Sequence, residues 1–249
     1  GPTELREVGE TEYVAAAARR SAETSGARIA GIVACCDLRL GDRLGAVLDA
    51  HEAAAGGLFR GIRHRLAFDP SGSASTSKRE PNTQHLMASD EFRAGVTLLG
   101  SRGLTFDAWL YHVQLPELSE MAAAVPGTTI VLDHIGAPLG VGTYARRRAD
   151  VHAWWRDRMI QLAERPNVVV KLGGVGMAVY GSGWVERGTP ATSREIINEW
   201  GGAIRFLIEH FGPQRCMFES NFPVDKLSFD YRTSRMRRSW LMKAWIWPS

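Results

Sequence analysis

Cysteine is scarce in this sequence. Three cysteines occur among the 249 residues, at Cys35, Cys36 and Cys216, and two of them are adjacent. No CxxC pair and no cysteine–histidine spacing typical of structural zinc is present, so a disulfide scaffold and a zinc-finger protein are both excluded. We therefore expect a reduced, cytoplasmic protein whose three thiols are small buried apolar groups.

Long hydrophobic runs and a one-sided charge are also lacking. No apolar stretch approaches the length needed to cross a membrane, and the polar first residues do not form a signal peptide. The 30 basic and 27 acidic residues leave a net charge of +3, which is too small to indicate a nucleic-acid partner. The sequence favours a small-molecule substrate, without nucleic acid or membrane, and leaves homo-oligomer formation open.

A glycine-rich nucleotide-binding motif is missing, although strands and helices alternate along the chain. The apolar patterns predict strands and helices as follows: strands Ile29–Leu38, Phe59–Phe68, Thr105–His112, Thr128–His134, Asn167–Leu172 and Arg215–Asn221; helices Glu12–Glu23, Asp42–Ala55, Asp90–Arg102, Leu115–Ala124, Val151–Glu164 and Ser193–Phe211. This alternation predicts parallel strands with right-handed crossovers. The expected fold class is α/β, a (β/α) TIM-like barrel that is incomplete, with about six of its eight strands.

Polar side chains gather where the predicted strands end. His112 and His134 each close a strand, and Glu219 and Asn221 end the last one, with Asp225 four residues on. Because strand residues alternate faces, we expect these side chains to point into the barrel above apolar neighbours, at the face where barrel sites are built. They are the candidate catalytic residues.

Three further residues are candidates for substrate binding. Arg63 and His64 close the second predicted strand, where they are suited to contact a carboxylate or hydroxyl groups, and a structural ion pair is the alternative for Arg63. Lys171 lies among valines in the fifth strand, a setting in which lysine either pairs with a carboxylate or serves a site.

Five sequence runs resemble the amidohydrolase-related family, in its lactonase-like branch. They are FRGIRH, LYHVQLPEL, IVLDHIGAPLG, NVVVKLGGVGM and MFESNFPVDK, in this order between about residues 27 and 231. The resemblance implies a distorted (β/α)₈ barrel, with His112 at the family's strand-five histidine and His134 at its strand-six histidine. It also places Asn221 where many relatives have an aspartate, and it implies a hydrolase.

The sequence departs from the family pattern in two ways. The family's H-x-H pair of strand one is absent, since no two of the seven histidines are two positions apart. The aspartate position holds Asn221, whose neutral amide is neither a general base nor a good ligand for a divalent ion. Glu219 or Asp225 is the expected substitute. We expect no cofactor, while zinc or manganese on His112 and His134 remains the alternative.

The expected reaction is the addition of water to the carbonyl of a sugar lactone or carboxylated lactone. In this hypothesis His112 and His134 polarise the carbonyl, and Glu219 or Asp225 is the base. Two rivals stay open: a metal-dependent decarboxylase of the same superfamily, and an inactive fragment. A stoichiometric metal would favour the first rival.

The two ends of the sequence are unusual. The chain starts at Gly1-Pro2 without a methionine, which indicates a cloning remnant or a start within a longer gene. We expect a barrel domain over residues 1–231 and a separate basic, tryptophan-rich tail over residues 232–249, of the kind that a frameshift produces. Without the H-x-H strand, we expect the chain as given to be a poor catalyst compared with a longer form.

Overall fold

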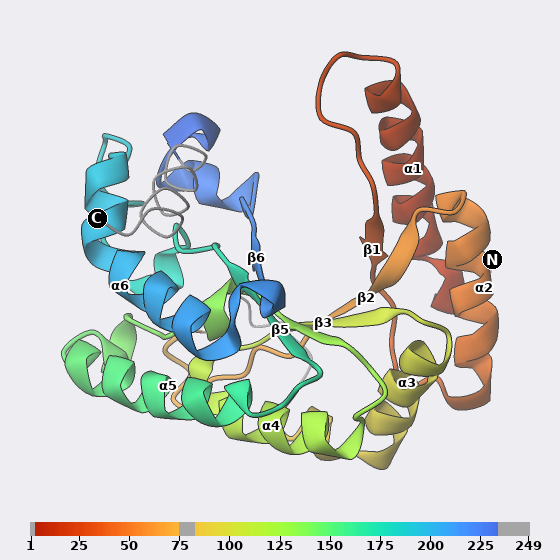
Figure 1. Ribbon diagram of the computed structural model, residues 1–249, viewed down its shortest axis with the longest axis horizontal. Coiled ribbons are helices and arrows are strands. Elements are labelled where there is room, and N and C mark those ends of the chain that lie inside the picture. Colours follow the sequence, from red (N-terminus) through yellow and green to blue (C-terminus); the bar gives the residue numbers. More distant parts are fainter. Residues whose placement is uncertain (1–2, 75–82, 234–249) are drawn as a thin grey trace. The chain divides into compact units, whose positions relative to one another are not determined.

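A computed structural model describes residues 3–74 and 83–233 of the chain. Its six strands belong to one sheet in the order of the sequence, and each is followed by helices or turns (Figure 1). The strands are β1 (Ile32–Ala34), β2 (Phe59–Arg65), β3 (Thr105–Trp109), β4 (Ile130–Leu132), β5 (Val168–Leu172) and β6 (Cys216–Phe218). The helices are α1 (Val8–Ala22), α2 (Leu44–Ala55), α3 (Asp90–Ser101), α4 (Leu115–Ala124), α5 (Arg148–Ala163) and α6 (Ser193–Phe211).

The strands run parallel, as the alternation with helices predicts. Parallel registers join β1 to β2, β2 to β3, and β5 to β6. This confirms the expected α/β class, an incomplete TIM-like (β/α) barrel with six strands. Among the described residues, no helix combines the length and the apolar character needed to span a membrane.

The chain divides into two compact units. The first contains residues 1–66, 84–109 and 117–131, and the second contains residues 67–83, 110–116 and 132–249. In the first unit α1 lies beside α2, and the core contains fully buried Ile62, Phe92 and Phe106 (Figure 1). Gly61 is required there, because a Cβ at this position would lie 2.3 Å from the Thr105 side chain.

The second unit is built around α6, whose apolar side is buried. Thr192 caps its N-terminus in a capping box with Glu195, so that each side chain accepts a hydrogen bond from the other residue's backbone N–H. Trp155 of α5, Trp200 of α6 and Tyr180 are each at most 1% exposed and form the aromatic core of this unit. Two of these side chains, those of Trp155 and Tyr180, donate hydrogen bonds to the carbonyls of Ile135 and His134.

The strands are shorter than predicted, and this changes how the histidines are placed. β3 ends at Trp109 and β4 at Leu132, so His112 and His134 begin short 3-10 turns beyond the strands. The prediction that strand alternation aims these rings is therefore wrong. Met217 of β6, the last strand of the sheet, is 40% exposed, so not every apolar residue near these strand ends is buried.

The predicted tail cannot be compared with the structure. Residues 234–249 lie outside the described residues, and with them nearly all of the tail over residues 232–249. Its separation from the barrel domain stays a prediction.

Candidate functional site

The imidazole of His134 and the carboxylate of Glu219 form a hydrogen-bonded pair in the second unit. The Nδ1 atom of His134 lies 2.7 Å from Oε1 of Glu219, and the backbone N–H of His134 donates to the same oxygen at 3.0 Å. The side chains are 2% and 13% exposed, respectively. Because a carboxylate only accepts hydrogen bonds, we assign the proton to Nδ1, which leaves Nε2 with its lone pair.

Two glycines at the end of β5 allow this pair to form. A Cβ on Gly173 would lie 2.5 Å from Cγ of Glu219, and one on Gly174 would lie 2.4 Å from Nδ1 of His134. Gly174 also has a φ of +69°, which a side chain disfavours. Because neither glycine has a side chain, the backbone after β5 can lie against both Glu219 and His134.

The His134 backbone begins a left-handed turn. The φ angles of His134, Ile135, Gly136 and Ala137 are 55°, 53°, 70° and 37°. Positive φ is rare for residues with a side chain and is a clear outlier for a β-branched residue such as Ile135. Such strain is concentrated at functional sites, where the surrounding structure holds it.

His112 is a second buried imidazole, and it is held in a different manner. Its Nδ1 accepts the backbone N–H of Leu139 at 3.3 Å, so its own proton lies on Nε2. The rings of Tyr144 and Trp154 stand edge-on to it, with centroids at 5.4 and 5.7 Å. Burial lowers the pKa of His112 to about 4, while the charge of Asp69 opposes this shift. The ring is thus a neutral donor at physiological pH.

Asn221 and Asp225 form another pair in the second unit. The side-chain amide of Asn221 donates to Oδ1 of Asp225 at 2.7 Å. Asp225 is 1% exposed, and burial raises its pKa to about 6, although the Asn221 hydrogen bond opposes the shift. Asp225 thus orients the amide of Asn221.

Lys171 pairs with a carboxylate, the first of the two roles expected for it. Its Nζ lies 2.7 Å from Oδ1 of Asp133, a residue that is completely buried. Asp133 directly precedes His134, so this ion pair fixes β5 to the chain at the point where the left-handed turn begins. A role of Lys171 in binding substrate stays a prediction.

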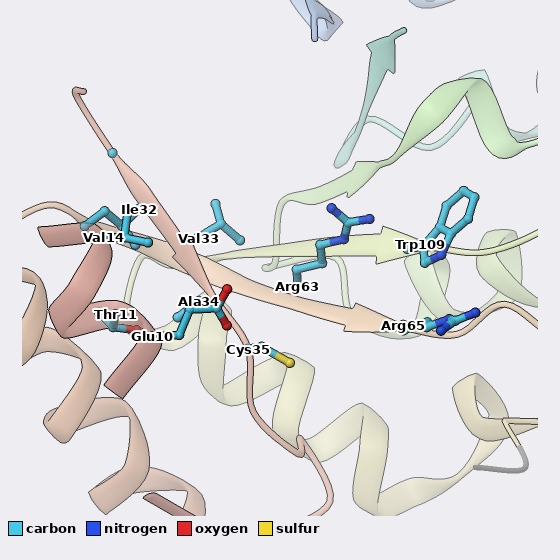
Figure 2. Close-up of a pocket in the computed structure, with 11 residues that line it drawn as sticks. Glu10, Thr11, Val14, Ile32, Val33, Ala34, Cys35, Arg63, Arg65 and Trp109 are labelled. Atoms are coloured by element: carbon cyan, nitrogen blue, oxygen red, sulfur yellow. The ribbon is translucent and has the colours of Figure 1, made fainter. Parts of the chain in front are cut away.

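Arg63 and His64 lie in the first unit, on opposite faces of β2. Arg63 lines a pocket of about 520 Å³ together with Arg65, Trp109 and residues of β1 and α1 (Figure 2). The ring of His64 is turned away from it, with Nδ1 3.2 Å from the carbonyl of Cys36 and an edge-on contact with Phe92. Burial lowers the pKa of His64. The geometry gives His64 a structural contact. A role of Arg63 in binding substrate stays a prediction.

A family model described as Amidohydrolase matches residues 3–239 of this sequence. The chain belongs to the amidohydrolase family. Membership confirms the family that the sequence runs around the two histidines predict, and it supports the general enzyme class, a hydrolase.

Similar proteins agree with this assignment. An uncharacterised protein, y4mH, of Sinorhizobium fredii is 36% identical over 201 residues, which cover 81% of this chain and 59% of that protein. An L-fucono-1,5-lactonase of Burkholderia multivorans is 30% identical, with coverage of 82% and 61%. A B. multivorans amidohydrolase crystallised with bound zinc is 26% identical, with a TM-score of 0.73 and coverage of 95% and 72%. The chain thus spans about three fifths of the length of these two curated relatives.

The residues that the structure describes do not by themselves fit a metal centre. Within residues 3–74 and 83–233, no group of three or more histidine, cysteine or acidic side chains is placed to hold an ion. Of the two histidines expected as ligands, His112 accepts a hydrogen bond at Nδ1 and carries its proton on Nε2. In a metal-bound histidine, by contrast, the nitrogen that does not bind the metal commonly donates a hydrogen bond. Glu219 is already bonded to His134, and Asn221 is bonded to Asp225. We assign no step to a metal.

Some residues of the site are missed by sequence reasoning. Tyr180, whose hydroxyl donates to the carbonyl of His134, lies well beyond β5 in a glycine-rich segment, and the glycine-rich character of that segment is the one usable signal. Trp155 resembles any core aromatic residue of a helix, and Leu139 acts through its backbone N–H. Neither gives a local signal, since each contact joins segments that are distant in the sequence.

Proposed function

We propose that this protein hydrolyses lactones, and that it opens a sugar lactone or carboxylated lactone by adding water to the ring carbonyl. The observation that carries the proposal is the pair formed by His134 and Glu219, which leaves a lone pair on Nε2 of a buried imidazole. The L-fucono-1,5-lactonase among the similar proteins supports the substrate class.

The geometry supports different catalytic roles for the two histidines. Nε2 of His134 takes a proton from water as the oxygen attacks the carbonyl, and Glu219 stabilises the imidazolium that forms. The Nε2–H of His112 donates to the carbonyl oxygen as negative charge develops there. The ring C–O bond then breaks, and His134 returns the proton to the leaving oxygen, which yields the hydroxy acid.

This scheme revises the roles expected from the sequence. In this scheme Glu219 acts through His134, because its oxygen Oε1 accepts hydrogen bonds from two N–H groups of His134. Asp225 is buried against Asn221, so we give it an orienting role. Asn221, in the family's aspartate position, keeps its amide oxygen available as a hydrogen-bond acceptor for water.

The test is a comparison of Glu219→Gln with the unchanged protein, in a longer form that contains this chain. A panel of aldonolactones that includes L-fucono-1,5-lactone is followed by acid release above the spontaneous rate. Glutamine keeps the shape but removes the charge that stabilises the imidazolium, so we expect kcat to fall about a hundredfold or more. The matched control is Glu199→Gln, because Glu199 pairs with Arg148 and Ser182 and with neither catalytic histidine.

Two results would contradict the proposal. One is that no lactone of the panel is hydrolysed faster than in buffer. The other is that Glu219→Gln and Glu199→Gln have equal effects, which would mean that the charge of Glu219 has no specific role.

A further inference from the structure

Four consecutive residues with positive φ, His134 to Ala137, form the segment that carries the catalytic imidazole, and we call it the left-handed turn. Three of them have side chains, and all three disfavour this conformation. The turn therefore persists because contacts from outside hold it. Its own 3-10 hydrogen bonds are not sufficient, since a right-handed turn would provide equivalent ones without strain.

Three hydrogen bonds from other elements hold the carbonyl groups of this turn. The hydroxyl of Tyr180 donates to the carbonyl of His134 at 2.5 Å, and Nε1 of Trp155 donates to that of Ile135 at 2.8 Å. The backbone N–H of His112 donates to the carbonyl of Ala137 at 3.1 Å. All of these groups are at most 3% exposed, so water does not compete for them.

The same segment connects the two histidine rings. One end of it holds Nδ1 of His134 against Glu219, and the next residues bring the N–H of Leu139 to Nδ1 of His112. The proton consequently lies on Nδ1 in one ring and on Nε2 in the other. A turn that relaxed to negative φ would redirect both contacts at once.

We infer that Tyr180 and Trp155 are positioning residues that hold the left-handed turn and thereby keep His134 as an acceptor and His112 as a donor. The catalytic meaning of this inference rests on the proposed function. Neither side chain needs to touch the substrate: both are fully buried, and both act through backbone carbonyls.

The neighbouring Trp200 provides a matched control. It is as buried as Trp155, and its ring packs on Tyr180 at 4.9 Å, but within the described residues its indole nitrogen has no hydrogen-bond partner. Trp155→Phe and Trp200→Phe therefore remove similar volumes from the same core, and only the first removes a hydrogen bond to the turn. Tyr180→Phe is the most conservative change, since it removes one hydroxyl.

The primary measurement is NMR of the ring nitrogens in the 249-residue chain labelled with ¹⁵N-histidine. We expect His134 and His112 to show single, opposite tautomers in the unchanged protein and in Trp200→Phe. In Tyr180→Phe and Trp155→Phe, both rings should shift toward tautomer-averaged values. In lactone assays of a longer form that contains this chain, kcat should fall about tenfold with KM within twofold, as expected for losing a group that orients the reacting ring.

The outcomes separate this inference from the proposed function. Equal spectra or equal kcat losses for Trp155→Phe and Trp200→Phe would overturn the inference, because Trp155 would then act by packing alone. Unchanged tautomers in Tyr180→Phe would overturn it as well. If the tautomers shift as expected but no lactone is hydrolysed by any form, the proposed function fails and the positioning role stands.

Discussion

At the scale of single residues, Glu219 provides a carboxylate where the sequence has the neutral Asn221 in the family's aspartate position. Asn221 is a neutral amide, and the carboxylate that reaches His134 belongs to Glu219, two positions earlier. Because Glu219 lies just beyond β6, its side chain reaches across Gly173 to the chain that follows β4. The pair of His134 and Glu219 thus depends on the absence of a side chain at Gly173 as well as on its own polar groups.

Gly174 provides the first prediction at this scale. In Gly174→Ala, the new Cβ would lie 2.4 Å from Nδ1 of His134, so the ring must leave Glu219. We expect the hydrogen bond of the pair to be lost, with kcat lowered about a hundredfold. Tautomer NMR and lactone assays measure the two effects.

The control for this prediction is Gly183→Ala. Gly183 has the same φ of +69°, but a Cβ there would meet no atom within 4 Å. Both variants carry the same backbone strain, of order 1 kcal/mol, and they differ in the clash. An intact His134 signal in Gly174→Ala would show that the glycine is needed for its backbone alone.

At the scale of secondary-structure elements, the ends of strands and helices determine where the site lies. β3 and β4 stop two residues or more before His112 and His134, and the chain then enters tight turns. Hydrogen bonds with Leu139 and Glu219 therefore orient the two histidine rings. The alternation of side chains along the strands does not orient them. α6 in turn holds Trp200 against Tyr180 beneath the turn.

The start of α6 gives a prediction at this scale. Thr192→Ala removes the hydroxyl that accepts the N–H of Glu195, so the unfolding free energy should fall by about 1 kcal/mol. Urea unfolding monitored by circular dichroism measures the change. Thr189→Ala, at an exposed position before the helix, should leave stability within about 0.5 kcal/mol. Equal losses in both variants would contradict the capping role.

At the scale of the whole molecule, two buried groups with opposite pKa shifts contribute to the pH dependence of stability in opposite directions. Asp225 has its pKa raised from 3.8 to about 6 by burial, so it contributes stability below pH 4 that is lost as the pH rises through 6. His112 has its pKa lowered from 6.5 to about 4, so its contribution is present above pH 6.5 and is lost as the pH falls toward 4. Between pH 4 and 6 the two contributions oppose each other.

We predict that substituting either residue changes how the free energy of unfolding depends on pH. Relative to the unchanged chain, Asp225→Asn should gain on the order of 2 kcal/mol of unfolding free energy as the pH rises from 4 to 6.5. His112→Asn should lose a similar amount over the same range. Urea unfolding at four pH values measures both differences. Parallel pH profiles for all three proteins would show that neither group titrates as its burial implies.

Much of this protein is determined by local sequence. The six strands and six helices follow from apolar spacing, and the ranges of α4 and α6 match the predicted ones at both ends. The family follows from short runs around His112, His134 and Asn221, and a family model matches residues 3–239. These features depend on neighbours within a few positions, where periodicity and residue type are informative.

Other features are decided by the tertiary structure. The sequence does not show that Glu219 bonds to His134, 85 positions earlier, or that Asp225 bonds to Asn221 and is too buried to act on water. It does not show that Ile135 and Ala137 take positive φ, because their intrinsic preference is the opposite and distant donors impose the turn. Hydrogen bonds in a dry interior override local preference, since leaving a buried polar group unpaired costs more than the strain.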